Sequence, residues 1–213
     1  MNPVPSNPLE NTIVALIGFA GTGKYTIGRE LCERTGARLI HNHLINNPIF
    51  SVVNADGVTP LPAGVWDRVK EIREVVYQAI QVLSPPEMSF VITMELRESN
   101  PLDRLAFVDL VELAAARQSR FVPIRLICGV DELCRRVSDP ERVAMLKEIS
   151  PELARKKSLE DEVLNIPHPN LRTLDVTKRS ASGSVDAILD EISAIKSVSN
   201  QTFTTGAGVV AGD

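Results

Sequence analysis

The sequence has few cysteines, and their number and spacing exclude two classes of small domain. The 213 residues include Cys32, Cys128 and Cys134 only. Three cysteines at these irregular spacings cannot form a zinc ribbon or a disulfide framework. An odd number of cysteines without a secretory signal is typical of reduced thiols, so we expect a cytoplasmic protein.

Long apolar runs and an excess of positive charge are also missing. No stretch approaches the roughly 20 apolar residues that a helix needs to span a bilayer. The net charge is -4, from 27 acidic and 23 basic side chains. This balance predicts neither a nucleic acid nor a membrane as partner. It is compatible with a local basic cluster that binds an anionic small molecule, and with either a monomer or a homodimer.

What the sequence does contain is the alternation of apolar strands and amphipathic helices that builds an α/β domain. Residues 13–17 (IVALI) form a continuous apolar run, which is typical of a strand buried on both faces of a parallel sheet. Further strands are predicted at 38–40, 90–94, 121–128 and 171–176. Helices are predicted from about residue 24, over 65–83, from 101, over 131–157 with two proline interruptions, and over 185–195.

Five strands separated by helices predict a three-layer, doubly wound, five-stranded parallel sheet. We place a single domain at residues 12–197, after a flexible lead at 1–11 and before a disordered tail at 198–213. Two insertions, 41–64 and 131–165, are expected over the carboxyl ends of the strands. Ligands bind at that edge in such sheets, so substrate contacts are to be sought in these two insertions.

A glycine-rich motif directly follows the first strand. Residues 18–26 read GFAGTGKYT, which matches G-x-x-x-x-G-K. Such a loop wraps phosphates with its backbone N–H groups, and the following helix adds its positive pole. A bare strand-to-helix turn is the alternative, but the lysine and the flanking strand and helix favour a phosphate site. We therefore predict that ATP is bound by Gly18, Ala20, Gly21, Thr22, Gly23, Lys24, Tyr25 and Thr26.

Tyr25 stands where Ser or Thr is usual in this motif. The usual hydroxyl is a ligand of Mg²⁺, and a phenol oxygen lies too far from the backbone to replace it directly. Thr26 supplies a hydroxyl one residue later. We predict that it reaches the α-phosphate region or orients a metal-bound water.

The layout from the loop at 18–26 to the segment 174–178 (LDVTK) before the last helix resembles the P-loop small-molecule kinases. These include shikimate, gluconate and nucleoside monophosphate kinases, and the likeness covers about residues 12–195. Adenylate kinases, whose loop reads G-K-G-T, also lack a hydroxyl directly after the lysine. The resemblance implies ATP and Mg²⁺ as cofactors, a small-molecule phosphoryl acceptor, and magnesium held largely by water and the nucleotide.

In these kinases an acid often follows the second strand and handles the acceptor hydroxyl, whereas here the sequence reads His41-Asn42-His43. A histidine is suited to act as a base because its pKa of roughly 6.5 is close to working pH. Both histidines face one side if the strand continues through them. Hydrogen bonding to neighbouring loops is an equally good interpretation, and no third ligand is evident for zinc.

Glu95 follows the third strand and is placed like a Walker B acid. We predict that Glu95 and Thr26 are the residues nearest Mg²⁺, Glu95 holding a metal-bound water. A surface glutamate at a strand end is the alternative. Arg97 lies two residues further on and is suited to bind an anionic group of the acceptor.

The charged insertion at 131–165 corresponds to the lid of the kinases that the chain resembles. The resemblance implies that Arg136 and Arg142, ahead of Arg135, stabilise the transferring phosphoryl group. A solvated helix face with i,i+4 pairs such as Glu132 with Arg136 is the alternative. The resemblance also places Thr177 near the adenine.

These motifs together predict an ATP-dependent phosphotransferase. Its predicted catalytic residues are Lys24, Glu95, His41, Arg136 and Arg142. A nucleotide-binding regulator or degenerate kinase is the competing hypothesis, favoured by Tyr25 and by the missing carboxylate after the second strand. A P-loop hydrolase that works on a protein ranks third, because the sequence has no sensor motif and no oligomer-forming extension.

Overall fold

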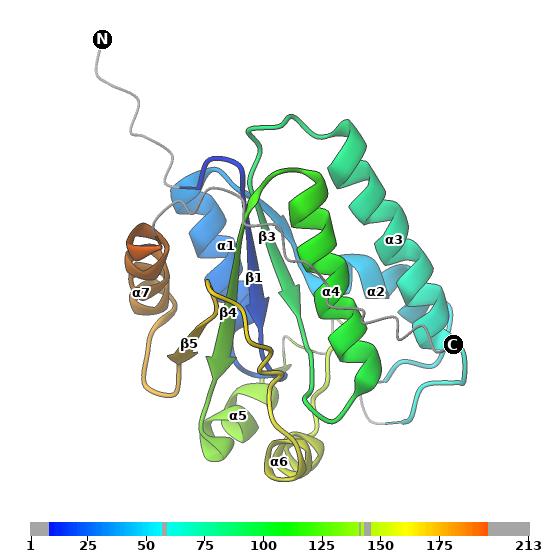
Figure 1. Ribbon diagram of the computed structural model, residues 1–213. Coiled ribbons are helices and arrows are strands. Elements are labelled where there is room, and N and C mark those ends of the chain that lie inside the picture. Colours follow the sequence, from blue (N-terminus) through cyan, green and yellow to red (C-terminus); the bar gives the residue numbers. More distant parts are fainter. Residues whose placement is uncertain (1–8, 57–58, 141, 143–145, 196–213) are drawn as a thin grey trace, which may run out of the picture.

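The computed structural model describes residues 9–56, 59–140, 142 and 146–195, and its centre is a five-stranded parallel sheet (Figure 1). The sheet order is β2-β3-β1-β4-β5, and every pairing is parallel. The strands are β1 (Thr12–Ile17), β2 (Arg38–Ile40), β3 (Phe90–Met94), β4 (Arg120–Ile127) and β5 (Arg172–Asp175). The predicted fold class is confirmed.

Helices cover both faces of the sheet, so the molecule has three layers (Figure 1). α1 and α7 pack together on one face, and α3 and α4 lie on the other, while α5 and α6 lie beyond the carboxyl ends of the strands. The helices are α1 (Lys24–Thr35), α2 (Asn42–Phe50), α3 (Val65–Leu83), α4 (Pro101–Ala116), α5 (Val130–Val137), α6 (Pro151–Glu160) and α7 (Ala181–Ala194). In the parts of the chain that are described, no helix is both long and apolar enough to cross a membrane.

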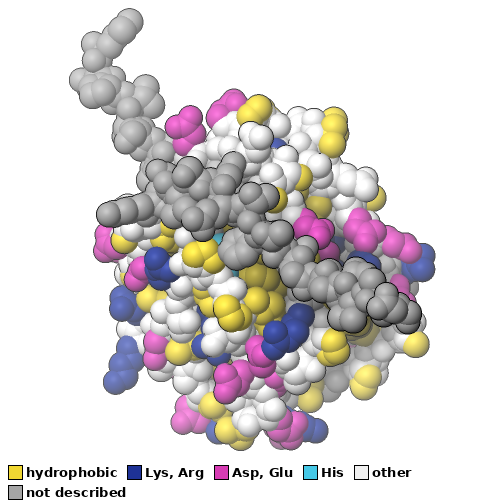
Figure 2. All heavy atoms as spheres, in the orientation of Figure 1, with side chains coloured by type: hydrophobic (Ala, Val, Ile, Leu, Met, Phe, Trp, Pro, Cys, Tyr) yellow, Lys and Arg dark blue, Asp and Glu magenta, His cyan; other side chains and the backbone are white. Residues whose placement is uncertain are grey.

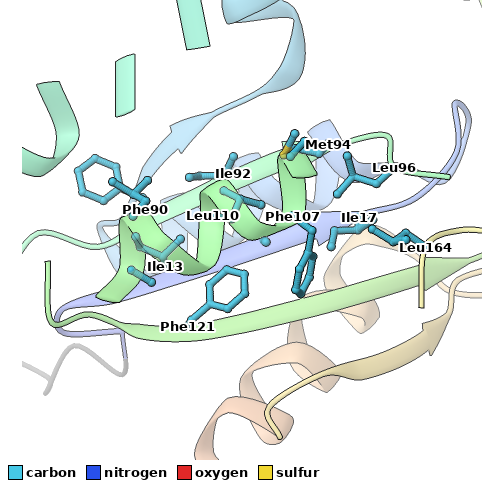
Figure 3. Packing of buried hydrophobic residues seen from close by; sticks show 14 of the residues in the cluster. Ile13, Ile17, Phe90, Ile92, Met94, Leu96, Phe107, Leu110, Phe121 and Leu164 are labelled. Carbon is cyan, nitrogen blue, oxygen red and sulfur yellow. The ribbon is translucent and has the colours of Figure 1, made fainter. Parts of the chain in front are cut away.

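The apolar run of β1 is explained by burial on both sides. Ile13 and Ile17 point into the cluster under α4, where Phe107 and Leu110 pack against them (Figure 3). Val14, between them, points to the opposite face and joins the cluster formed with α1 and α7. Because successive side chains of a strand alternate between faces, a strand with no polar position needs apolar partners on both.

Two segments differ from the sequence-based expectation. Leu9 is fully buried in the cluster under α1 and α7, and the N–H of Asn11 donates to the Glu87 carbonyl, so residues 9–11 belong to the domain rather than to a flexible lead. α2 forms within the polar stretch 41–64 despite Pro48, because it buries Ile45 and Phe50 against α3. Residues 1–8 of the predicted lead and the predicted tail at 198–213 lie outside the described residues.

Arg117 holds the end of α3 against the sheet. Its side chain is only 9% exposed, and it donates hydrogen bonds to the carbonyls of Ile80, Pro85 and Met88. Its guanidinium carbon lies 5.1 Å from the centroid of the Phe90 ring. The side chain therefore satisfies carbonyl groups that the end of α3 and the following turn leave without helical partners.

Replacing this arginine is expected to destabilise the fold. Arg117→Met keeps most of the apolar packing but removes the arginine donor from all three carbonyls, of which that of Pro85 keeps a backbone hydrogen bond from the Met88 N–H. The free energy of unfolding should therefore fall by about 2 kcal/mol. Chemical denaturation followed by circular dichroism measures it. As a control, Arg68→Met removes an exposed arginine paired with Glu71, and it should cost less than about 1 kcal/mol. Equal losses in the two variants would contradict this role of Arg117.

Candidate nucleotide-binding site

A large cleft lies beyond the carboxyl ends of the strands. Its volume is about 1620 Å³, and the described residues that line it come mainly from the loop at 20–26, α2, residues 55 and 59–61, α3, the segment after β3, α4, α5, residues 139, 142 and 146–148, and α6 with the residue after it. Sites for one small ligand are typically about 300–1,000 Å³, so this cleft has room for two ligands. Of the predicted site residues, the following line it: Ala20, Gly21, Gly23, Lys24, Tyr25, Thr26, His41, Glu95, Arg136 and Arg142.

The loop between β1 and α1 has the backbone that its sequence demands. Gly21 and Gly23 have φ angles of 84° and 83°, which L side chains rarely adopt. A Cβ at Gly18 would lie 2.8 Å from the Leu126 carbonyl oxygen and 2.8 Å from Thr22 Oγ1. Gly18 and Thr22 are buried behind the loop, and the Thr22 hydroxyl donates to the Phe19 carbonyl at 2.8 Å. They shape the loop and do not line the cleft.

Lys24 opens α1 and lies inside this loop. Its Nζ donates to the carbonyl oxygens of Gly18 at 2.6 Å and Phe19 at 2.7 Å. Burial lowers the pKa of Lys24 to about 8, even though the carboxylate of Glu95 acts in the opposite direction. Nearby cations, Arg142 foremost, add to the lowering. The lysine is therefore charged at neutral pH but close to its titration range.

This shifted pKa predicts how the expected affinity for ATP depends on pH. Below pH 8 Lys24 already carries its proton, whereas above pH 8 the free protein must take up a proton to bind polyphosphate as the ammonium. The association constant for ATP should therefore fall by about tenfold per pH unit above pH 8. Isothermal titration calorimetry at constant ionic strength measures it. Lys24→Met should remove this slope, and a flat wild-type profile would contradict the assignment.

Glu95 follows β3 and connects the loop to the lid-like insertion. Its Oε2 accepts the Ala20 N–H at 3.1 Å, and its Oε1 accepts Lys157 Nζ at 2.6 Å. Burial raises the pKa of Glu95, but the charges of Lys157 and Lys24 outweigh that effect and lower it. Glu95 is thus an ionised carboxylate beside the phosphate loop.

The insertion between β4 and β5 carries the predicted arginines. Arg136 donates to Glu132 Oε1 at 2.7 Å and to the Val176 carbonyl at 2.9 Å, and a Cβ at Gly23 would lie 3.8 Å from its Nη1. The i,i+4 pair of the alternative interpretation is therefore present, on an arginine that also adjoins the loop. Arg142 is partly buried, donates to the Glu148 carbonyl at 2.9 Å, and contributes to the lowered pKa of Lys24.

Arg135 and Thr177 are the two other predicted residues of this part of the chain. Arg135 lies at the cleft edge with a largely exposed side chain that pairs with Glu132 at 2.7 Å. Thr177 does not line the cleft. Its hydroxyl accepts the Gly129 N–H at 2.8 Å and donates to Asp175. Its carbonyl accepts a bond from Arg136 at 3.4 Å, so Thr177 lies behind the arginine.

The two histidines line the cleft but do not lie on one strand face. β2 ends at Ile40 and α2 begins at Asn42, whose N–H donates to Thr93 Oγ1 at 3.0 Å. The strand therefore does not continue through the two histidines, so the condition for both of them to face one side is not met. His43 Nδ1 donates to Asn47 Oδ1 at 3.1 Å, which leaves its Nε2 lone pair available, and burial lowers the pKa of His43 to about 4.

His41 and Tyr25 form an aromatic pair beside the loop. Their ring centroids lie 5.0 Å apart, and Lys147 Nζ lies 4.6 Å from the centroid of the Tyr25 ring. Burial lowers the pKa of His41, and its Nδ1 is buried without a hydrogen-bond partner among the residues described. The tyrosine that replaces the usual hydroxyl residue therefore packs between a histidine and a cation.

The far end of the cleft contains residues that no sequence motif indicated. Asn46 is only 3% exposed and lines the cleft. Arg73 Nε is buried without a hydrogen-bond partner in the part of the chain that the structure describes, and the Arg73 guanidinium lies 3.9 Å from the nearest oxygen of Asp109. Trp66 is 57% exposed and packs edge to face against Phe50. The packing of α2 on α3 brings these groups together.

The cleft differs in charge from the rest of the molecule. Its described lining includes 11 Lys and Arg side chains against 8 Asp and Glu, a local excess of three positive charges in a chain whose net charge is -4. On the face drawn in Figure 2, by contrast, acidic and basic side chains are interspersed.

The described residues contain no group of three or more His, Cys, Asp or Glu that could hold a metal ion. The carboxylate of Glu95 beside the phosphate loop is compatible with Mg²⁺, because this ion commonly binds phosphates and water with only one or two carboxylates.

The parallel sheet, the phosphate loop and the lid-like insertion together define a P-loop fold with the layout of a small-molecule kinase. No protein-family model and no curated protein sequence matches the chain. Solved structures do match.

A gluconokinase from Sinorhizobium meliloti 1021 is 14% identical with a TM-score of 0.58, covering 87% of this chain and 94% of that one. A sugar kinase from Janibacter sp. HTCC2649 is 15% identical with a TM-score of 0.57, covering 86% and 95%. The shikimate kinase from Acinetobacter baumannii, in complex with shikimate, is 18% identical with a TM-score of 0.56, covering 90% and 97%. At these identities the likeness shows the fold alone, and that fold is the one of the P-loop small-molecule kinases.

Proposed function

We propose that the protein is an ATP-dependent phosphotransferase that acts on a small metabolite. The observation that carries this proposal is the position of Lys24, buried in the phosphate loop beside Glu95. The cleft around it is large enough for a nucleotide and an acceptor. The part of its wall formed by α2 and α3, with the buried Asn46 and the Arg73 Nε that has no partner among the described residues, is suited to the acceptor.

At the phosphate end, each residue has a role that follows from its charge and place. The N–H groups of the loop and the ammonium of Lys24 would bind the β- and γ-phosphates. Arg136 and Arg142 would neutralise the charge that spreads over the transferring phosphoryl group. Glu95 and Thr26 would hold the water shell of Mg²⁺, which when bound neutralises oxygens of the β- and γ-phosphates.

At the acceptor end, a histidine would remove the proton of the attacking hydroxyl. His43 offers a neutral Nε2, because its Nδ1 hydrogen is engaged by Asn47, but a pKa lowered to about 4 makes it a weak base. His41 is the other candidate, since it lies beside Tyr25 in the same cleft. Transfer of the phosphoryl group to the hydroxyl oxygen would leave ADP and a phosphomonoester.

A coupled assay of ADP formation tests this proposal. The panel should include nucleosides, nucleotides, sugar acids and shikimate, each with ATP and Mg²⁺. We expect one chemical class of acceptor to stimulate turnover well above the rate with ATP alone. No stimulation by any acceptor, together with tight binding of ATP, would contradict phosphotransfer.

A nucleotide-binding regulator without transferase activity is the second candidate function. Tyr25 supports it, because the ring packs against His41 and Lys147 and replaces the hydroxyl that usually binds the metal. This alternative predicts saturable ATP binding that is lost in Lys24→Ala, with no product under any acceptor. Binding and turnover measured side by side distinguish the two functions.

A further inference from the structure

Lys157 occupies an unusual position for a residue of the insertion. It belongs to α6, yet its Nζ lies 2.6 Å from Glu95 Oε1, beside the phosphate loop. The Lys157 side chain is 22% exposed and lines the cleft. Its ammonium therefore lies at the carboxylate of Glu95, which follows β3. At this position P-loop proteins commonly bind the metal through an acidic residue.

A second carboxylate fixes the ammonium from the other side. Lys157 Nζ also donates to Glu148 Oε2 at 2.8 Å, and the backbone carbonyl of Glu148 accepts a hydrogen bond from Arg142. Glu95 in turn accepts the Ala20 N–H. The lysine is thus part of a continuous network that runs from the insertion to the phosphate loop.

This network keeps Lys157 charged. Burial alone would lower the pKa of Lys157, but Glu95 and Glu148 outweigh burial and raise it. The ammonium also contributes to the lowered pKa of Lys24, so its field reaches the lysine of the phosphate loop. The ammonium offsets one of the two carboxylate charges of Glu95 and Glu148, so a polyphosphate meets less repulsion beside the loop than these carboxylates alone would exert, and little solvent screens this effect.

We propose that Lys157 is a tethered cation that takes part of the place of Mg²⁺, so that the site binds nucleoside triphosphate without a divalent ion. This inference rests on the proposed function for the identity of the ligand. A cation held at Glu95 also repels and competes with a metal ion at the same carboxylate. Lys157 therefore strengthens binding of metal-free ATP and reduces the gain in affinity that Mg²⁺ brings.

The test compares ATP binding with Mg²⁺ and with excess EDTA, by isothermal titration calorimetry on the full chain. The quantity of interest is the ratio of the dissociation constant in EDTA to that in Mg²⁺. In Lys157→Met this ratio should be at least tenfold larger than in the wild type. Lys157→Arg should restore most of the metal-free binding. Lys156→Met removes the same charge from the adjacent, exposed residue of the cleft wall, and it should leave the ratio unchanged.

An unchanged ratio in Lys157→Met, with ATP bound in Mg²⁺, would overturn this inference and leave the proposed function intact. Absence of ATP binding by the wild type in Mg²⁺ would instead overturn the proposed function. Circular dichroism establishes that each variant folds. Should Lys157→Met fail to fold, combining it with Glu148→Gln removes both members of a partly buried pair, and the ratio is then compared with that of Glu148→Gln alone.

Discussion

Lys24→Met is expected to lower kcat/KM for ATP by about a thousandfold, which corresponds to about 4 kcal/mol of transition-state stabilisation. Lys24 is the ammonium that the phosphate loop encloses, at 2.6 Å from the Gly18 carbonyl oxygen. Methionine matches its length without its charge, so the variant should lose the charge-assisted bonds that we propose to the β- and γ-phosphates. Steady-state kinetics with the acceptor found in the panel measures the effect, and calorimetry separates binding from turnover.

Lys156→Met provides the matched control for this substitution. Lys156 also lines the cleft, but it is exposed, so its charge is screened by water. We expect less than about a threefold change in kcat/KM for this variant, because exposed charges contribute little interaction energy. Comparable losses in Lys24→Met and Lys156→Met would mean that general cleft charge, and not the enclosed ammonium, determines activity.

Gly18→Ala is expected to damage both the fold and the site. The new Cβ would lie 2.8 Å from the Leu126 carbonyl oxygen and 2.8 Å from Thr22 Oγ1, and neither is the far end of a flexible side chain. Overpacking of this kind costs typically about 1–3 kcal/mol, and we expect the upper end of that range because the contact is with strand backbone. The loop must shift to relieve the contact, so ATP affinity should also fall by about a hundredfold. Denaturation and calorimetry measure the two effects.

Gly28→Ala tests whether the effect is specific to the loop. Gly28 is also buried, but a Cβ there would approach only side chains, the nearest being the end of Leu39 at 2.9 Å. Because Gly28 lies inside α1, alanine also gains about 1 kcal/mol in helix propensity, which offsets the crowding. ATP affinity should stay near the wild-type value. Equal losses of affinity in both variants would contradict the steric account of Gly18.

The sheet and the phosphate loop were predictable because local chemistry determines them. An apolar run with no polar alternation, such as residues 13–17, can be buried only with partners on both faces. The loop that follows needs glycine where φ is positive, as at Gly21 and Gly23, and its lysine opens the helix. Glu95 could be located for the same reason, since it directly follows a recognisable buried strand.

Other parts of the site depend on contacts between distant segments. The pair of Lys157 with Glu95 spans 62 positions, and a lysine in a charged helix has no feature that distinguishes it from solvated neighbours. α2 was not predicted, because its asparagines and Pro48 are poor helix formers and its stability comes from packing on α3. Asn46 and Arg73 are polar residues whose burial only that packing creates.

Titration of the folded protein with ATP in magnesium buffer is the most direct test of a polyphosphate site at Lys24. The account predicts saturable binding at one site per chain, displaced by ADP and strongly weakened in Lys24→Met. No heat of association at high ligand excess, with either ATP or GTP, would contradict it and leave a P-loop fold without its expected ligand.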